Sequence, residues 1–411
     1  MAIQSTPAGF SGSQNKAYSL FSIMTGHIGP IICLCATDDG KLASGDGVRM
    51  WNLRKMTELD RPSGAGQRGA TTALSWIRRE DEPDDGLVYG TANGFLVCWK
   101  ETTSGENSLF EETYCVQIAK AVEVTGIAFE AGSNRIAICN RNSGVQVFLT
   151  DSRMELHHIF SIAISNHIPK AIAFGQMNGE HKDILTFGLY DGNIHMLRGR
   201  DGKVQQTRNT GGNAAVNARR GVFCIDDPLQ GAALYRLDSG ARIRTYPVGM
   251  EKPPRPRQVT FAEDCSVILS GSDHGVVYVF DRRSGEVLDK LKVGDDRIQA
   301  TTATDIDETP FVLTAIAKGK GEASDIIVWQ KNTDNRVQRK VKGHFPETWD
   351  SLKIVVSVCL CVASVVLIVH NLEVRVHFPD QFFVDQPAPY ILHGQINADI
   401  VEKAMDYLGL I

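Results

Sequence analysis

Residues 42–51 read LASGDGVRMW: a short strand of small and apolar residues, a glycine turn, and a second strand that ends in Trp51. The same phrase returns along the chain, for example as VYGTANGFLVCW (88–99) and ILSGSDHGVVYVF (268–280). Each copy ends in a large residue, and the later end points are Trp99, Phe148, Leu197, Tyr235, Phe280 and Trp329. Successive end points are 48, 49, 49, 38, 45 and 49 residues apart. One four-stranded propeller blade takes roughly 40–45 residues, so this period predicts a propeller.

Seven copies predict seven blades. A further short strand precedes most copies, as in IICLCAT (31–37) and TALSWI (72–77), and we expect it to line the centre of the ring. Five of the seven turns also carry a glycine four or five residues before the terminal large residue, which predicts backbone positions with φ > 0. These glycines are Gly47, Gly94, Gly144, Gly192 and Gly275. The alternative all-β fold is a sandwich with periodic turns, but sandwiches do not repeat a blade-length phrase.

The closure of the ring has two solutions. Residues 17–27 (AYSLFSIMTGH) can supply the outer strand of the last blade, and so can residues 336–344 (RVQRKVKGH). Only one of them can pair with the strand that ends at Trp329. We favour the N-terminal strand, because pairing the two ends of the chain seals the ring.

The first copy resembles a WD40 repeat, with Gly26-His27 as the family's Gly-His pair and Trp51-Asn52 in its Trp-Asp position. The resemblance covers residues 18–343 and implies an all-β, seven-bladed WD40-type propeller of four-stranded blades. It also implies that four residues form the family's structural hydrogen-bond tetrad: His27, Ser44, Asp46 and Trp51. The other copies are degenerate, because they keep the large residue while most lack Gly-His. Such a fold implies a binding platform.

Nothing in the sequence predicts an enzyme. A His-Ser-Asp cluster can suggest a hydrolase triad, but the resemblance makes His27, Ser44 and Asp46 a structural network. The motifs of common hydrolases, kinases and P-loop proteins do not occur. The nine cysteines include no C-x-x-C pair, and the formal net charge is −5. We therefore expect no metal, cofactor, small-molecule substrate or nucleic acid, and we expect Cys33 and Cys35 to pack in the core.

Two loops that enter blades are basic and suggest a partner-binding patch. The residues concerned are Arg61, Arg68, Lys252, Arg255 and Arg257. As a hypothesis, the patch contacts an acidic protein segment or anionic lipid headgroups. The simpler interpretation is solvated loop charge that keeps the ring soluble, and Asp295 and Asp296 in another entering loop favour it.

Residues 354–369 (IVVSVCLCVASVVLIV) form the longest uncharged stretch. With its flanks this stretch predicts a transmembrane helix over 354–372, preceded by a linker over 344–353 and followed by a tail over 373–411. Basic residues cluster before the span, so the positive-inside rule places the propeller in the cytosol and the tail in the lumen or outside. A pair of buried strands is the alternative. The first residues, 1–17, show no secretory signal and are expected to be disordered.

The sequence therefore predicts a non-catalytic protein-interaction scaffold, tethered to a membrane by one C-terminal span, with an endomembrane favoured. Two other functions remain open. The layout of propeller, span and lumenal tail is similar to that of the ER-anchored exchange factor for the Sar-type GTPase, although no counterpart of that family's potassium-binding loop is evident. A soluble substrate receptor of a ubiquitin ligase would instead bury residues 354–369.

Overall fold

The computed structural model describes residues 16–45, 47–62, 68–104, 107–189, 191–210, 212–227, 229–249, 257–316 and 323–332. The chain divides into two compact units, 1–339 and 340–411, and every described residue belongs to the first. The linker, span and tail predicted over 344–411 lie outside the described residues. No helix in the described ranges is long and apolar enough to cross a bilayer.

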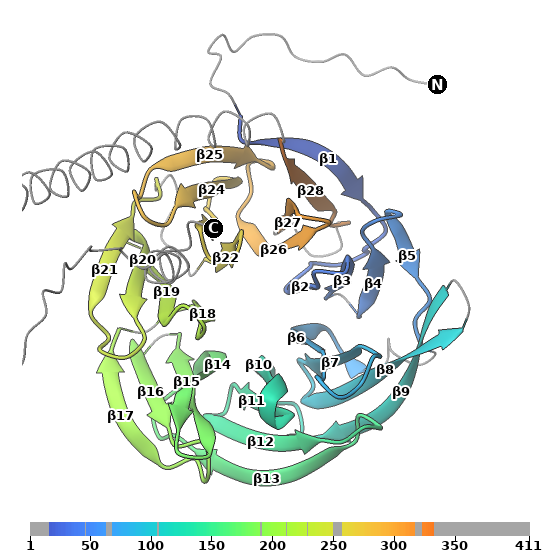
Figure 1. Cartoon of the computed structure of the whole chain (residues 1–411), viewed down its shortest axis with the longest axis vertical. Coiled ribbons are helices and arrows are strands. Elements are labelled where there is room, and N and C mark those ends of the chain that lie inside the picture. The colour runs from blue at the N-terminus through green and yellow to red at the C-terminus, as the bar shows by residue number, and fades with distance from the viewer. Residues whose placement is uncertain are drawn as a thin grey trace, which may run out of the picture. The chain divides into compact units, whose positions relative to one another are not determined.

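The described residues form seven four-stranded antiparallel sheets arranged as blades around a common centre (Figure 1). In blades 1 to 6 the strands follow in chain order from the innermost to the outermost. Blade 1 contains β2 (Leu34–Ala36), β3 (Lys41–Ser44), β4 (Arg49–Asn52) and β5 (Thr57–Leu59). Blade 2 contains β6 (Thr71–Ile77), β7 (Gly86–Thr91), β8 (Phe95–Ser104) and β9 (Asn107–Gln117). Blade 3 contains β10 (Val124–Glu130), β11 (Arg135–Asn140), β12 (Gly144–Thr150) and β13 (Leu156–Ala163). Blade 4 contains β14 (Pro169–Asn178), β15 (His181–Gly188), β16 (Asn193–Leu197) and β17 (Val204–Asn209). Blade 5 contains β18 (Ala214–Asn217), β19 (Val222–Asp227), β20 (Gly231–Arg236) and β21 (Arg242–Tyr246). Blade 6 contains β22 (Val259–Ala262), β23 (Val267–Ser270), β24 (Val276–Asp281) and β25 (Val287–Lys292). The predicted seven-bladed architecture is confirmed.

Blade 7 joins the two ends of the ring. Its inner strands are β26 (Ile298–Ile306), β27 (Thr309–Ile316) and β28 (Ile326–Lys331), and its outermost strand is β1 (Tyr18–Met24). β1 pairs antiparallel with β28, so the N-terminal strand closes the ring as expected. Lys16 and Ala17 belong to this closure, because Asn332 donates hydrogen bonds to both of their carbonyl oxygens. Our expectation of disorder through residue 17 is therefore wrong at its last two residues.

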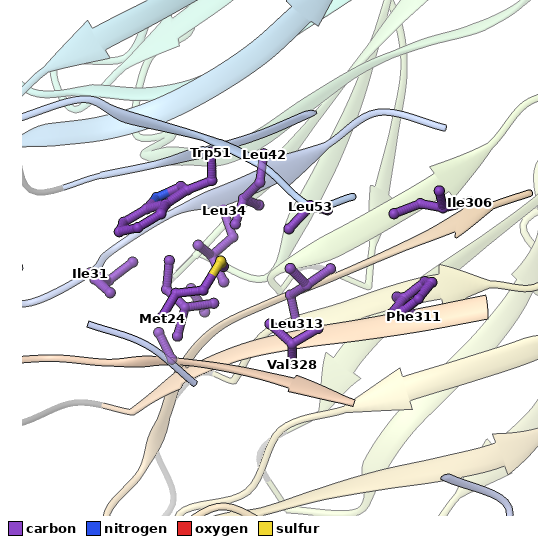
Figure 2. Packing of buried hydrophobic residues seen from close by; sticks show 13 residues of the cluster. Met24, Ile31, Leu34, Leu42, Trp51, Leu53, Ile306, Phe311, Leu313 and Val328 are labelled. Atoms are coloured by element: carbon purple, nitrogen blue, oxygen red, sulfur yellow. The ribbon is translucent and has the colours of Figure 1, made fainter. Parts of the chain in front are cut away.

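The buried hydrophobic side chains of the described residues form seven clusters, each between two neighbouring blades. Figure 2 shows the cluster at the seam between blades 7 and 1, where Trp51 and Leu42 of blade 1 face Leu313 and Val328 of blade 7. Burying one such side chain contributes about 1.5–3 kcal/mol. The two ends of the chain are therefore held together by packing as well as by strand pairing.

Turn glycines behave as expected at four of the five positions. Gly47, Gly94, Gly192 and Gly275 have φ between 58° and 81°. A Cβ at Gly94 would lie 1.8 Å from the Ala119 carbonyl oxygen, so only glycine fits there. The prediction is wrong at the third turn, because Ser143 carries the positive φ of 63° there, one residue before Gly144.

Strand direction defines two faces of the ring. We call the top face the end formed by the loops that enter each blade and by the turns between second and third strands. The bottom face carries the turns between first and second strands and between third and fourth strands. Most of the residues discussed below as candidate sites belong to the top face or to the strands near it.

Candidate functional site

The first blade contains the buried hydrogen-bond network that its resemblance implies. Trp51 Nε1 donates to Ser44 Oγ at 2.9 Å, and Ser44 Oγ lies 2.8 Å from His27 Nε2. Which of these two groups donates depends on the imidazole tautomer, and Ser44 Oγ also lies 3.4 Å from the Arg49 carbonyl oxygen. Asp46, the fourth expected member, lies outside the described residues.

This network connects the loop before blade 1 to the second and third strands of the blade. His27, Ser44 and Trp51 are 1%, 0% and 4% exposed. A nucleophilic serine has to reach a substrate, whereas this hydroxyl is sealed inside the blade and already accepts a hydrogen bond. The geometry is that of a structural tie between strands.

A second network of the same kind lies in blade 4, and the sequence analysis missed it. His167 Nδ1 lies 2.6 Å from Asp191 Oδ2, and its Nε2 lies 3.1 Å from Thr186 Oγ1. The carboxylate can only accept, so Nδ1 donates to it; the direction of the contact between Nε2 and the threonine hydroxyl depends on the tautomer. Asn166 stands in place of the glycine of the Gly-His pair, so the motif was not recognised in this copy of the repeat. The histidine-to-hydroxyl spacing, 19 residues against 17 in blade 1, is the signal that would have revealed it.

His195 extends this cluster. Its ring meets the His167 ring edge to face with centroids 4.5 Å apart, and burial followed by the proximity of His167 lowers its pKa. The nitrogen and carboxylate atoms of His167, Asp191 and His195 that could ligate a metal lie within 4.8 Å of one another. However, both nitrogens of His167 already have partners, and His195 Nδ1 lies 2.9 Å from Thr207 Oγ1. We interpret the cluster as a second strand-tying network.

The residues of the predicted basic patch differ in their surroundings where the structure describes them. Arg61 is exposed, whereas both terminal nitrogens of Arg68 are hydrogen-bonded to the Glu112 carboxylate. Lys252 and Arg255 lie outside the described residues.

Arg257 is not a surface residue at all. It is 1% exposed, and its Nε donates to Asp226 Oδ1 at 2.9 Å while its backbone N–H donates to Asp226 Oδ2 at 2.6 Å. Its Nη2 donates to the Asp227 carbonyl oxygen at 2.7 Å. The side chain ties the loop before blade 6 to the second strand of blade 5, so the prediction that it contacts a partner is wrong.

The clearest concave site in the described part of the ring is the top end of the central channel. A cavity of about 450 Å³ opens there, and all seven blades contribute to its lining. We call it the channel mouth and define it by its lining residues, most of which lie in or just before the innermost strands. They include Leu34, Leu74, Glu123, Ile127, Arg141, Lys170, Ile172, Ala214, Gln258, Arg297 and Gln299.

Charged and amide side chains gather at the channel mouth. Arg141 Nη1 lies 2.9 Å from Glu123 Oε2, and Lys170 Nζ lies 4.0 Å from Glu123 Oε1. Arg297 donates to Gln299 Oε1 at 2.8 Å. Among the described lining residues the mouth thus has three cations and one carboxylate.

The sequence analysis missed these residues, although they have a common signal. Glu123 and Arg297 immediately precede an innermost strand, and Lys170 is the second residue of another. Aligning the copies at their innermost strands would have brought these positions together.

No protein-family model matches the sequence, and no curated protein matches it either. Solved structures do match. The crystal structure of the WD40 β-propeller domain of Doa1 aligns with a TM-score of 0.57 and 17% identity, over 79% of this chain and 99% of that one. This chain has the fold of a WD40-type seven-bladed propeller. At this level of identity the likeness concerns the fold alone.

Proposed function

We propose that this protein is a non-catalytic protein-interaction scaffold that binds its partner at the channel mouth. The observation that carries the proposal is a cavity of about 450 Å³ to which every blade contributes. Binding sites concentrate in concave surfaces where loops are presented by a rigid framework. The hydroxyl and imidazole groups that could suggest catalysis are instead buried in the strand-tying networks of blades 1 and 4.

Affinity capture followed by reconstitution tests this function. The full chain, carrying a tag, is extracted from membranes, its associated proteins are identified, and each candidate is purified and titrated against the purified chain. We expect at least one protein to bind directly and saturably. If no associated protein binds directly, the scaffold function is wrong.

We also propose that residues 354–372 tether the propeller to a membrane, with the propeller in the cytosol and 373–411 on the other side. Support comes from sequence alone: an uncharged 16-residue run preceded by Arg336, Arg339, Lys340, Lys342 and Lys353. Eleven residues of that run are Val, Ile or Leu, each of which favours insertion by about 0.3–0.6 kcal/mol.

Alkaline carbonate extraction tests the tether. The wild-type chain should stay in the membrane pellet, and a matched variant with Val362→Asp and Val365→Asp should be released, because each central aspartate costs about 2.5–3.5 kcal/mol of insertion. Release of the wild-type chain would contradict the tether and favour the soluble alternative, without affecting the scaffold proposal.

A further inference from the structure

We propose that the outer rim of blades 4 to 7 lies against an anionic lipid bilayer. The rim consists of the bottom halves of the four outermost strands, β17, β21, β25 and β1, together with the turns that precede β17, β21 and β25. This inference rests on the proposed membrane tether and adds a surface of the propeller itself to the membrane contact. The rim includes none of the residues of the basic patch predicted from the sequence.

The rim differs from the rest of the ring at one register position. In every blade, one residue of the outermost strand pairs with the large residue that ends the copy of the repeat. In blades 4, 6 and 7 this residue is Val204, Val287 or Leu20, which are 42%, 44% and 53% exposed. In blade 5 it is Arg242, and the next residue, Ile243, is 47% exposed. Four successive blades therefore expose aliphatic side chains along one arc of the outer edge (Figure 1). In blades 1 to 3 the same position is polar: Glu58, Glu112 and His158.

Charge follows the same division of the ring. In blades 4 to 6, the segments from the end of each copy to the end of the outermost strand are 198–209, 236–246 and 281–292. They contain eleven Lys and Arg against five Asp and Glu. The corresponding segments of blades 1 to 3 contain four against seven, and they are 52–59, 100–117 and 149–163. Positive charge is therefore concentrated on blades that also expose aliphatic side chains.

Several cations of the rim are available to bind anions. Five exposed ones have neither an ion pair nor a side-chain hydrogen bond within the described ranges: Arg200, Lys203, Arg236, Arg244 and Arg283. The exposed carboxylates of the same turns are fewer: Asp238, Glu286 and Asp201, of which Asp201 pairs with Arg198. A basic surface with exposed aliphatic side chains matches the boundary between the headgroups and the acyl chains of an anionic membrane.

The course of the chain favours a bilayer as the partner. β28 ends at the bottom face, and Asn332, which follows it, donates hydrogen bonds to the carbonyl oxygens of Lys16 and Ala17 just before β1. Twenty-one residues, 333–353, separate Asn332 from the span proposed over 354–372. A chain of that length reaches at most about 80 Å, so the span would keep the ring within that distance of the bilayer.

The shape of the rim also favours a bilayer. Its exposed aliphatic side chains are spread over four blades along the convex outer edge of the ring (Figure 1). A bilayer takes up such separated side chains one at a time, because it adapts to the surface that lies on it. Nucleic acid would contact the cations and leave the aliphatic side chains in water.

Vesicle flotation tests this inference. The full chain carries Val362→Asp and Val365→Asp, so that its span does not insert and only the propeller can hold it on a vesicle. The vesicles either mix phosphatidylserine with phosphatidylcholine or contain phosphatidylcholine alone. We expect at least ~10-fold tighter binding to the phosphatidylserine vesicles, and this binding should weaken as salt is raised. If carbonate extraction releases the wild-type chain, the wild-type chain is floated in its place.

Two matched charge variants of the same chain locate the binding. Lys203→Gln with Arg244→Gln removes two cations of the rim and should weaken binding to the phosphatidylserine vesicles at least ~5-fold. Lys55→Gln with Arg153→Gln removes two exposed cations from blades 1 and 3 and should leave the binding unchanged. Equal melting temperatures check that both variants keep the fold.

A third variant tests the apolar part of the rim. Val204→Thr, Ile243→Thr and Val287→Thr together keep β-branched side chains in the three strands, so the sheets should be retained. Because each change replaces an apolar group by a hydroxyl, we expect binding to the phosphatidylserine vesicles to weaken at least ~5-fold.

The inference is overturned if the chain binds phosphatidylserine vesicles no better than phosphatidylcholine vesicles, or if either rim variant floats as the control variant does. Loss of vesicle binding together with hydrogen-exchange protection of 198–209 by a captured protein would assign the rim to that protein instead. These outcomes are separate from a failure of the tether, which carbonate extraction reports. A chain that inserts its span but fails the flotation test keeps the tether and loses the rim contact.

Discussion

The hydroxyl of Ser44 is a single group on which three parts of blade 1 depend. It accepts from Trp51 and lies 2.8 Å from His27 in a site with no exposure to water. Removing one partner from a buried hydrogen bond costs the desolvation free energy of the groups that are left.

Ser44→Ala should therefore lower the free energy of unfolding by about 1–3 kcal/mol, measured by denaturant titration. Ser152→Ala, at an exposed serine, is the control and should change it by less than about 0.5 kcal/mol. Equal effects at the two serines would show that the blade 1 network does not stabilise the fold.

The buried pair of Arg257 and Asp226 makes a larger contribution by the same reasoning. Asp226→Asn leaves a buried guanidinium without its carboxylate, and we expect a loss of about 3–5 kcal/mol in unfolding free energy. Asp264→Asn is the control, because Asp264 pairs with Arg220 at the surface and should contribute about 0–1 kcal/mol. A loss below about 1 kcal/mol at Asp226 would contradict the structural role of the pair.

Cysteine reactivity reports burial at single residues. Burial raises the pKa of the Cys33 thiol to about 12, and likewise that of Cys139. Thiolate is the reactive form, so these thiols stay protonated at pH values below about 12 and should resist alkylation in the native state. Cys115 is the exposed cysteine among the described residues and should be alkylated first, as followed by mass spectrometry. Early alkylation of Cys139, which is buried in the second strand of blade 3, would contradict the structure of that blade.

At the scale of elements, β1 shows how far apart in sequence the closing contacts lie. Besides pairing with β28, it anchors to blade 6, where Tyr18 OH donates to Glu263 Oε1 at 2.6 Å and Tyr18 N–H donates to Asp289 Oδ2 at 2.9 Å. Deleting residues 1–24 should lower the melting temperature and expose the edge of β28 to aggregation. Deleting 1–15 keeps the whole strand and is the control. Equal melting temperatures for the two deletions would mean that the ring does not need this closure.

The elements were largely predictable because blade strands are short, local and repeated. The period of the repeat located the innermost strands. The pairing of the two chain ends followed from the need to cover the open edge of the last blade. What sequence could not supply depends on contacts between blades. Arg257 looked like a surface charge because nothing in its own loop indicates Asp226, which lies 31 residues earlier. The His167 network was hidden because Asn166 replaces the motif's glycine.

At the scale of the whole molecule, the rigid ring and the channel mouth have different origins. The seven clusters between blades give stability, and they consist of side chains that the blade period positions. The mouth is instead lined by charged side chains at the starts of innermost strands (Glu123, Lys170 and Arg297) and in the turn after β11 (Arg141). None of these four residues belongs to a core cluster, so the residues that set the charge of the mouth differ from those that stabilise the ring.

Hydrogen exchange of the full chain, alone and bound to a captured partner, tests the central claim most directly, because it maps binding onto the two faces. We predict protection in peptides that cover 123–127, 168–172 and 297–299, which come from three different blades and meet at the channel mouth. Protection confined to bottom-face turns, such as 53–56 and 151–155, with none at the mouth, would contradict the account.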